Sequence, residues 1–297
     1  MKYSSPPLKF EEQAEILLKR GLIADKEVLI KRLQAVNYYR LSSYWHPFLS
    51  RDNSFKSGTT LEEIWRRYTF DRHLRLIVLD AIERIEIGIR TSLTYNFVHV
   101  YGPFGYLKNE NIPNLIPKDY KRWLDFLKSE TRRSREEFVI NFFASHGDQH
   151  EWLPLWMAGE TLTFGMLVTF FRGAHKSIKR QVSQQYSLAF GVLESWVRAL
   201  NTIRNICAHH SRLWNRELGD KPIIPLAKKH PEWHMPVEIK NNRVFGILTI
   251  LKYLLGNIAP QSNWFSRLQG LLIEYPEIPL NQMGFPEEWT KNPIWKR

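Results

Sequence analysis

Proline is unevenly distributed along the chain, and this distribution limits where long helices can form. No proline lies between Pro47 and Pro103 or between Pro154 and Pro222. Because proline lacks an amide hydrogen and clashes with the preceding helical turn, long helices are expected in these two windows. Residues 221–236, in contrast, contain four prolines in 16 residues and are expected to form a long ordered loop.

Hydrophobic periodicity indicates the fold class. The TLEE sequence at residues 60–63 is a capping-box pattern, and the apolar residues that follow recur at helical spacing: Leu74, Ile77, Val78, Ala81, Ile82, Ile85 and Ile89. Two short amphipathic helices are expected before it, one closed by Gly21 and one opened by Asp25. The SREE sequence at 134–137 predicts a second capping box, and further apolar runs cover 244–255 and 264–273. No segment alternates with period two, so an all-α fold is predicted.

The chain contains no linker long enough to require independent domains. We therefore expect one all-α domain over residues 1–297, with a helical segment at 1–58, a helical core at 59–216, and a loop with helices at 217–297 that pack on the core.

Charge favours a polyanionic partner. Forty-two Lys and Arg residues against thirty Asp and Glu residues leave a formal net charge of +12. Nucleic acid is the leading candidate, although many cytosolic proteins are basic without binding it. The single cysteine, Cys207, allows no intramolecular disulfide. No run approaches about 18 apolar residues and the start lacks the apolar segment of a secretory signal, so a cytoplasmic protein without a membrane partner is expected.

The stretch RNICAHHSRLWNR, at residues 204–216, ends the second helical window and combines three arginines with two adjacent histidines. Upstream of and within it, one side of a helix is apolar: Leu193, Trp196, Leu200, Ile203 and Cys207. The opposite side is polar: Glu194, Arg198, Asn201, Asn205, His209 and Arg212. The apolar stripe is expected to face the core, and the polar stripe requires water or a partner. Most polar stripes are solvated surface.

Three side chains of this stretch can converge on one anion. Asn205 lies one turn before His209, so its amide can orient the imidazole, and Arg204 lies at the border of the stripes with a side chain long enough to reach over. His210 falls on the apolar side and is interpreted as a packing histidine.

The order of Arg204, Asn205 and His209 resembles the R-x4-H signature of the HEPN superfamily of helical ribonucleases. Four segments also appear in the order found in the Abi abortive-infection family, and most resemble its AbiD- and AbiF-like members: LQAVNYYRLSSYWHPF, YTFDRHLRLIVLDAIERIEIGIRTSL, PLWMAGETLTFGML and RNICAHHSRLWNR. The resemblance covers most of residues 10–216 and implies that residues 59–216 form an HEPN-like bundle. Residues 217–297 carry no such motif.

The resemblance implies a metal-independent endoribonuclease that acts as a toxin in phage defence. Arg204, Asn205 and His209 would be the catalytic residues, with His209 as general acid or base and Arg204 stabilising the phosphorane-like transition state. One histidine cannot easily act as base and acid on opposite sides of one phosphorus atom, and the chain has one motif. The HEPN resemblance implies that two protomers bring Arg204 and His209 together across a two-fold axis, so a homodimer with a composite site is expected. Similar proteins are found beside structured noncoding RNAs, which makes an inhibitory RNA a candidate partner.

Further basic residues would contact the RNA substrate. Residues 118–135 mix cations with Tyr120 and Trp123, a combination suited to phosphate contact and base stacking, although a solvated helix face would look the same. The predicted RNA-binding residues are Lys121, Arg122, Lys128, Arg132, Arg133, Arg212, Asn215 and Arg216.

No cofactor or metal is expected. His230 and His234 have helical spacing, but Pro231 lies between them and no further ligands are evident. The alternative function is a non-catalytic RNA-binding module that keeps the HEPN scaffold and senses or sequesters a structured RNA.

Overall fold

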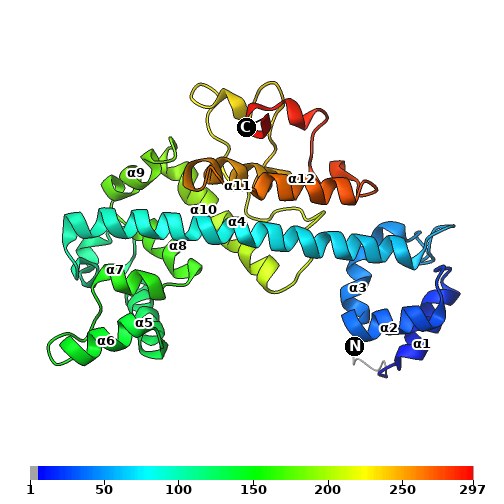
Figure 1. The fold of residues 1–297 in the computed structure, drawn as a ribbon, viewed down its shortest axis with the longest axis horizontal. Coiled ribbons are helices and arrows are strands. Elements are labelled where there is room, and N and C mark those ends of the chain that lie inside the picture. The colour runs from blue at the N-terminus through cyan, green and yellow to red at the C-terminus, as the bar shows by residue number, and fades with distance from the viewer. Residues whose placement is uncertain (1–5, 297) are drawn as a thin grey trace. The chain divides into compact units, whose positions relative to one another are not determined.

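A computed structural model gives the fold and describes residues 6–296 (Figure 1). These residues form thirteen α-helices, with short 3-10 helices and three isolated β-bridges but no β-strand. The predicted all-α class is confirmed. No helix within 6–296 combines the length and the apolar character needed to cross a bilayer.

The chain divides into two compact units. Unit 1 contains the described residues up to Leu76 together with Arg267–Pro279. Unit 2 contains Ile77–Ser266 together with the described residues from Leu280 onward. The long helix α4 (Leu61–Tyr101) and the helix α12 (Trp264–Glu274) each contribute to both units. The boundaries expected after residues 58 and 216 stay predictions.

Unit 1 contains three helices besides its parts of α4 and α12. They are α1 (Phe10–Lys19), α2 (Lys26–Val36) and α3 (Tyr38–Trp45), followed by the 3-10 helix η1 (His46–Phe48). The predicted stop and start between α1 and α2 are confirmed: Gly21 adopts a φ of 93°, and Asp25 Oδ1 accepts a hydrogen bond from Val28 N at 2.9 Å.

The capping box at the start of α4 is also confirmed. Glu63 N donates to Thr60 Oγ1 at 3.2 Å, and Thr60 N donates to Glu63 Oε2 at 2.8 Å. Further along this helix, Asp71 and Arg75 form a buried ion pair that Tyr44 of α3 joins, its hydroxyl donating to Asp71 Oδ2 at 2.7 Å. Pairing and hydrogen bonding make this burial of charge tolerable.

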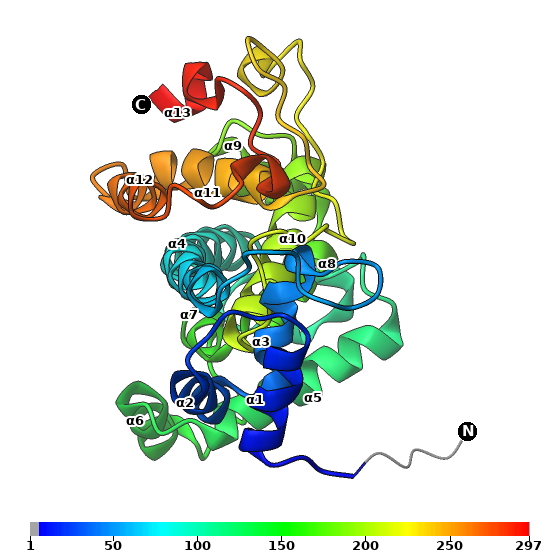
Figure 2. The ribbon, with the colours of Figure 1, turned by 90° about the vertical axis from the view of Figure 1, so that its right-hand side faces the viewer.

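Unit 2 contains the remaining helices. They are α5 (Pro117–Arg133), α6 (Glu137–His146), α7 (Leu155–Ala158), α8 (Phe164–Gly173), α9 (Lys176–Gln184), α10 (Phe190–Ala208), α11 (Val244–Ile258) and α13 (Pro293–Lys296). Short 3-10 helices join them: η2 (Gly105–Leu107), η3 (Asn109–Asn111), η4 (Gly159–Thr161), η5 (Pro231–Trp233), η6 (Leu280–Met283) and η7 (Trp289–Lys291). Helix α8 contacts both α5 and α10, and α10 also contacts α9 (Figure 2).

The core of unit 2 uses the apolar faces that the spacing predicts. On α4, the predicted Ile85 and Ile89 are fully buried. Phe97, which lies beyond the predicted set, is also fully buried, and its ring lies 5.0 Å from that of Phe170 on α8. On α10, the whole predicted apolar stripe is buried, from Leu193 to Cys207. Because the apolar stripe of α10 is buried, the polar stripe on the opposite side of that helix faces outward.

The segment after α10 is anchored to that helix. Trp196 Nε1 donates to the carbonyl oxygen of Ile223 at 2.7 Å, and Ile223 N donates to Ser195 Oγ at 2.9 Å. The Trp233 ring lies 5.0 Å from Trp196. These contacts order the proline-rich loop.

The predicted capping box at residues 134–137 is wrong in detail. Ser134 closes α5, because its amide donates to the carbonyl oxygen of Glu130 at 3.0 Å. Helix α6 then begins at Glu137 with Glu136 as its N-cap residue. Ser134 is therefore the C-cap residue of α5, whereas the pattern had assigned it as the N-cap residue of the following helix.

Candidate functional site

The C-terminus of α10 determines where the polar residues of the motif lie. His209 is the C-cap residue, and its amide donates to the carbonyl oxygen of Asn205 at 2.9 Å. His210 adopts a left-handed φ of 57°, its amide donating to Cys207 O at 3.0 Å, and Ser211 N donates to Ile206 O at 2.9 Å. This pair of bonds is a Schellman motif, which ends the helix directly after Ala208.

The end of α10 separates the two stripes as expected. Ile203 and Cys207 are each 1% exposed, whereas Arg204, Asn205 and His209 are exposed. The interpretation of His210 as a packing residue is wrong, since it is exposed. Its positive φ turns the chain away from the helical course, so helical spacing no longer determines where its side chain lies.

Arg204 and Asn205 contact each other through their side chains. Arg204 Nη1 donates to Asn205 Oδ1 at 3.3 Å. The sequence suggested that this amide orients the imidazole, but its oxygen accepts from the guanidinium instead. The link from Asn205 to His209 runs through the backbone carbonyl.

A half-buried acidic residue of α4 interacts electrostatically with Arg204. Burial raises the pKa of Glu86, while the positive charges of Arg90 and Arg204 oppose that rise. Arg90 Nη2 lies 2.6 Å from Glu86 Oε1 and also donates to the carbonyl oxygen of Leu162 at 2.9 Å. Glu86 was missed by sequence reasoning, because only the packing of helices distant in sequence brings it near Arg204.

In the N-terminal half of α10, the charged residues of the polar stripe form ion pairs. Glu194 Oε2 lies 2.8 Å from Lys179 Nζ, and Arg198 donates to both carboxylate oxygens of Asp220, at 2.7 and 2.9 Å. Within the described residues, Arg204 and His209 form no salt bridge of this kind at 4.0 Å or less. The last turn of α10 is therefore the part of the stripe that can receive an anion.

The residues that follow this turn form a compact segment. Arg216 Nε donates to the carbonyl oxygen of Arg212 at 2.8 Å, and the Asn215 carbonyl oxygen accepts from Arg243 Nη1 at 3.0 Å. Arg212, Asn215 and Arg216 are half-buried, and Trp214 is fully buried. Their predicted contact with RNA stays a prediction.

The basic residues of α5 differ in how far they are neutralised. Lys128 pairs with Glu151, which Arg132 also approaches at 3.7 Å, and Arg133 lies 3.3 Å from Glu130. Lys121 and Arg122 are exposed and form no salt bridge with any described residue. Among the predicted RNA-binding residues of α5, these two are the cations most accessible to an anion.

The sequence pointed to Tyr120 and Trp123 as stacking residues of α5, but the more exposed ring is that of Phe126. Tyr120 is half-buried, and its hydroxyl donates to the carbonyl oxygen of Tyr106 at 3.1 Å. Trp123 is 3% exposed, and its Nε1 donates to the carbonyl oxygen of Met166 at 3.1 Å. Phe126 is 49% exposed, and the Arg122 guanidinium carbon lies 5.4 Å from the centre of its ring. The i, i+4 spacing from Arg122 is the sequence signal that could have identified Phe126.

The two histidines of the proline-rich loop have separate partners. His230 Nδ1 lies 3.1 Å from Glu232 Oε1, and His234 Nε2 lies 2.7 Å from the carbonyl oxygen of Pro225. In the part of the chain that the structure describes, no three His, Cys, Asp or Glu side chains gather as they would around a metal ion.

A family model described as Abi-like protein matches residues 31–215. The matched range includes the last turn of α10 and all of α5. Neither a curated protein nor a solved structure matches the chain.

Proposed function

The chain belongs to the Abi-like protein family, whose name refers to abortive infection, and from this premise we propose that it is a metal-independent endoribonuclease of the HEPN superfamily. In this proposal it acts as a toxin or effector in defence of the bacterial cell against phage. Arg204, Asn205 and His209 form the catalytic group.

One observation carries the proposal: Arg204, Asn205 and His209 are all exposed at the last turn of α10, whereas the cations and anions above them pair with each other. A guanidinium stays charged and offers a planar pair of donors to phosphate oxygens. An imidazole can accept a proton in its neutral form and donate one in its charged form, so it can act as a general base or a general acid. This pair of groups has the properties that phosphodiester cleavage requires.

The reaction is an internal transesterification of RNA. A general base removes the proton of the 2′-hydroxyl, and the resulting oxygen attacks the adjacent phosphorus. The bond to the 5′-oxygen breaks, and a general acid protonates that leaving oxygen. The products are a 2′,3′-cyclic phosphate and a 5′-hydroxyl, and Arg204 offsets the charge that develops on the phosphoryl oxygens. DNA lacks the attacking hydroxyl and would not be cut.

The two proton transfers occur on opposite sides of the phosphorus, which one imidazole cannot serve at once. We therefore propose a homodimer in which the last turns of α10 from two copies meet around one phosphodiester. His209 of one copy would act as base and His209 of the other as acid. Light scattering tests this step, because a stable monomer that still cuts RNA would contradict the composite site.

The partner that restrains the enzyme is proposed to be a structured noncoding RNA. The net charge of +12 supports binding to a polyanion, and such binding weakens steeply with salt. High-salt purification should therefore remove a bound RNA before activity is measured.

The deciding experiment is RNA cleavage in EDTA by the salt-stripped protein. Arg204→Ala and His209→Ala are each expected to lower the rate by about 10²–10⁴-fold. His210→Gly is the matched control, since it removes the neighbouring imidazole and suits the left-handed backbone at that position. RNA that stays intact with the wild type but is bound tightly would instead support a non-catalytic RNA-binding module.

A further inference from the structure

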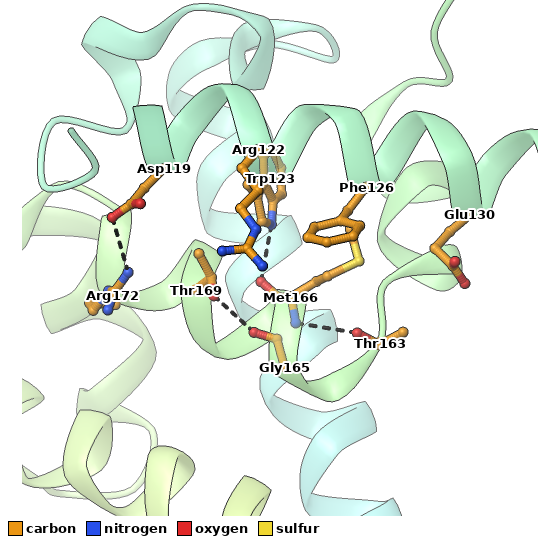
Figure 3. A pocket seen from close by; sticks show the side chains of 10 residues that line it. All are labelled: Asp119, Arg122, Trp123, Phe126, Glu130, Thr163, Gly165, Met166, Thr169 and Arg172. Carbon is orange, nitrogen blue, oxygen red and sulfur yellow. Dashed lines mark hydrogen bonds and ion pairs between the residues drawn. The ribbon is translucent and has the colours of Figure 1, made fainter. Parts of the chain in front are cut away.

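A cavity of about 490 Å³ lies between α5 and α8, within unit 2 (Figure 3). Arg122 and Phe126 project into it from α5, while Gly165, Thr169 and Arg172 line it from α8. Its volume falls within the range of small-molecule pockets and is sufficient for a single nucleotide.

The cavity is held in shape by contacts at both ends of α8. Trp123 Nε1 donates to the Met166 carbonyl oxygen at 3.1 Å, which joins the two helices across the cavity. At the other end, Asn114 N donates to the carbonyl oxygen of Gly173 at 3.1 Å. A cavity with such fixed walls requires little ordering when a ligand binds.

The cavity offers one accessible aromatic face. Phe126 is 49% exposed, whereas the Trp123 ring is buried against Phe170, with ring centres 5.1 Å apart. A planar ligand can therefore stack on Phe126 and on the Arg122 guanidinium beside it.

Hydrogen-bonding groups and charges surround this face. Thr169 lines the cavity, and its Oγ1 donates to Gly165 O at 3.0 Å, so this hydroxyl can still accept a hydrogen bond from a ligand. Arg172 Nη2 lies 4.0 Å from Asp119 Oδ2, a distance at the limit of an ion pair. Glu130 lies at the opposite end of the cavity from Arg172 (Figure 3). Two cations, two carboxylates and two hydroxyls around a flat apolar surface match a nucleotide better than a purely apolar ligand.

The cavity also adjoins the polar stripe of α10. A Cβ atom on Gly165 would lie 3.9 Å from the Asn201 amide, so α8 and α10 are in close contact there. Asn205 is one helical turn further along α10, a rise of about 6 Å. A single-stranded chain that reaches Arg204 can therefore place a nearby base in the cavity.

We propose that this cavity binds one unpaired nucleobase of the RNA substrate, stacked on Phe126, with the adjoining phosphates at Arg122 and Arg172. The assignment rests on the proposed function for the identity of the ligand as RNA. A base held in a duplex cannot enter, so the subsite would select single-stranded RNA next to the cleavage site.

The test measures binding rather than cleavage, in a His209→Ala background that keeps the RNA intact. The probe is a short single-stranded RNA that carries one 2-aminopurine, whose fluorescence falls when it stacks. Phe126→Ala is expected to weaken binding by about 5- to 100-fold and to abolish the quenching, and Phe126→Tyr should restore both. Because Phe126 is half-exposed, these variants should fold, and Phe126→Leu provides a version that keeps apolar volume without the ring.

Arg122 and Lys121 form the matched charge control. Both are exposed cations on the same helix, but only Arg122 lines the cavity. Arg122→Ala should weaken binding several-fold more than Lys121→Ala. Equal losses at the two positions, with Phe126→Ala binding like the parent, would overturn the subsite and leave a diffuse basic surface.

The outcomes also separate this proposal from the nuclease proposal. If Phe126→Ala loses binding but the wild type cuts no RNA, the subsite proposal is supported and the nuclease proposal is rejected. A wild type that cuts RNA and a Phe126→Ala variant that binds and cuts equally well would reject the subsite alone.

Discussion

Arg204 Nη1 donates a hydrogen bond to Asn205 Oδ1 at 3.3 Å, while the backbone carbonyl oxygen of the same Asn205 accepts from His209 N at 2.9 Å. One asparagine thus contacts both other residues of the proposed catalytic group, with its side chain on the arginine and its backbone on the histidine. Within that group, the proposed role of Asn205 is to position the other two residues.

Substitution of Asn205 tests that role. Asn205→Ala removes one neutral acceptor and should lower kcat/KM by about 2- to 10-fold, the scale of a single hydrogen bond. Asn205→Asp should lower it further, mainly through KM, because a carboxylate beside Arg204 competes with the substrate phosphate. Cleavage kinetics check this order, and an Asp variant as active as the Ala variant would contradict it.

The positive charge of Arg204, like that of Arg90, favours the ionised form of Glu86. Glu86→Gln removes the competing negative charge and should tighten RNA binding by about 2- to 5-fold in a His209→Ala background. Glu83→Gln is the control, since it removes an exposed carboxylate from the same helix. An equal gain in RNA affinity from both substitutions would show that the effect comes from net charge alone.

Glu86 also predicts a pH dependence of stability. Burial raises its pKa above the ordinary value of 4.5, so the folded state retains the proton to a higher pH than the unfolded state does. The contribution of Glu86 to the free energy of unfolding therefore falls as pH rises through this interval. The difference in free energy of unfolding between the wild type and Glu86→Gln should therefore fall as pH rises above 4.5. Loss of the ion pair with Arg90 shifts the size of this difference but not the sign of its slope. Urea unfolding at several pH values checks the slope, and a rising difference would contradict the assignment.

The left-handed backbone of His210 predicts a difference between two substitutions. At a φ of 57°, a residue with a Cβ is disfavoured by roughly 1–2 kcal/mol, which glycine avoids. His210→Gly and His210→Ala both remove the imidazole, so their comparison isolates the backbone. The Gly variant should be more stable than the Ala variant by about 1 kcal/mol in chemical denaturation, and equal stabilities would reject the Schellman geometry.

Gly173 and Gly191 form another matched pair. A Cβ on Gly173 would lie 2.5 Å from Ile112 Cγ2 and 2.6 Å from Leu115 Cγ, so Gly173→Ala should cost about 1–3 kcal/mol. Gly191, in the first turn of α10, has no heavy atom within 4 Å of an added Cβ, and Gly191→Ala should stabilise by about 0.4–1 kcal/mol. Thermal unfolding of both variants measures the two signs. A neutral Gly173→Ala would show that α8 and the segment before α5 are less tightly packed than described.

The sequence by itself determined the helical fold and the two sides of α10. Spacing of apolar residues is a local property, so it correctly predicted that the stripe from Leu193 to Cys207 would be buried and that Asn205 and His209 would face outward. Helix caps at Asp25 and Thr60 are equally local and were predicted for the same reason. Ser134 was not, because a capping pattern does not state which of two adjacent helices will use it.

Only the tertiary structure decided which side chains from distant segments meet. Trp123 and Phe126 lie three residues apart on neighbouring positions of one helix face, and periodicity cannot tell which of them the packing of α8 will cover. The approach of Glu86 to Arg204, and of Gly165 to Asn201, likewise depends on how α4 and α8 pack against α10. Local patterns determine the direction in which a side chain leaves its own helix, whereas its neighbours depend on the shape of every surface packed around that helix.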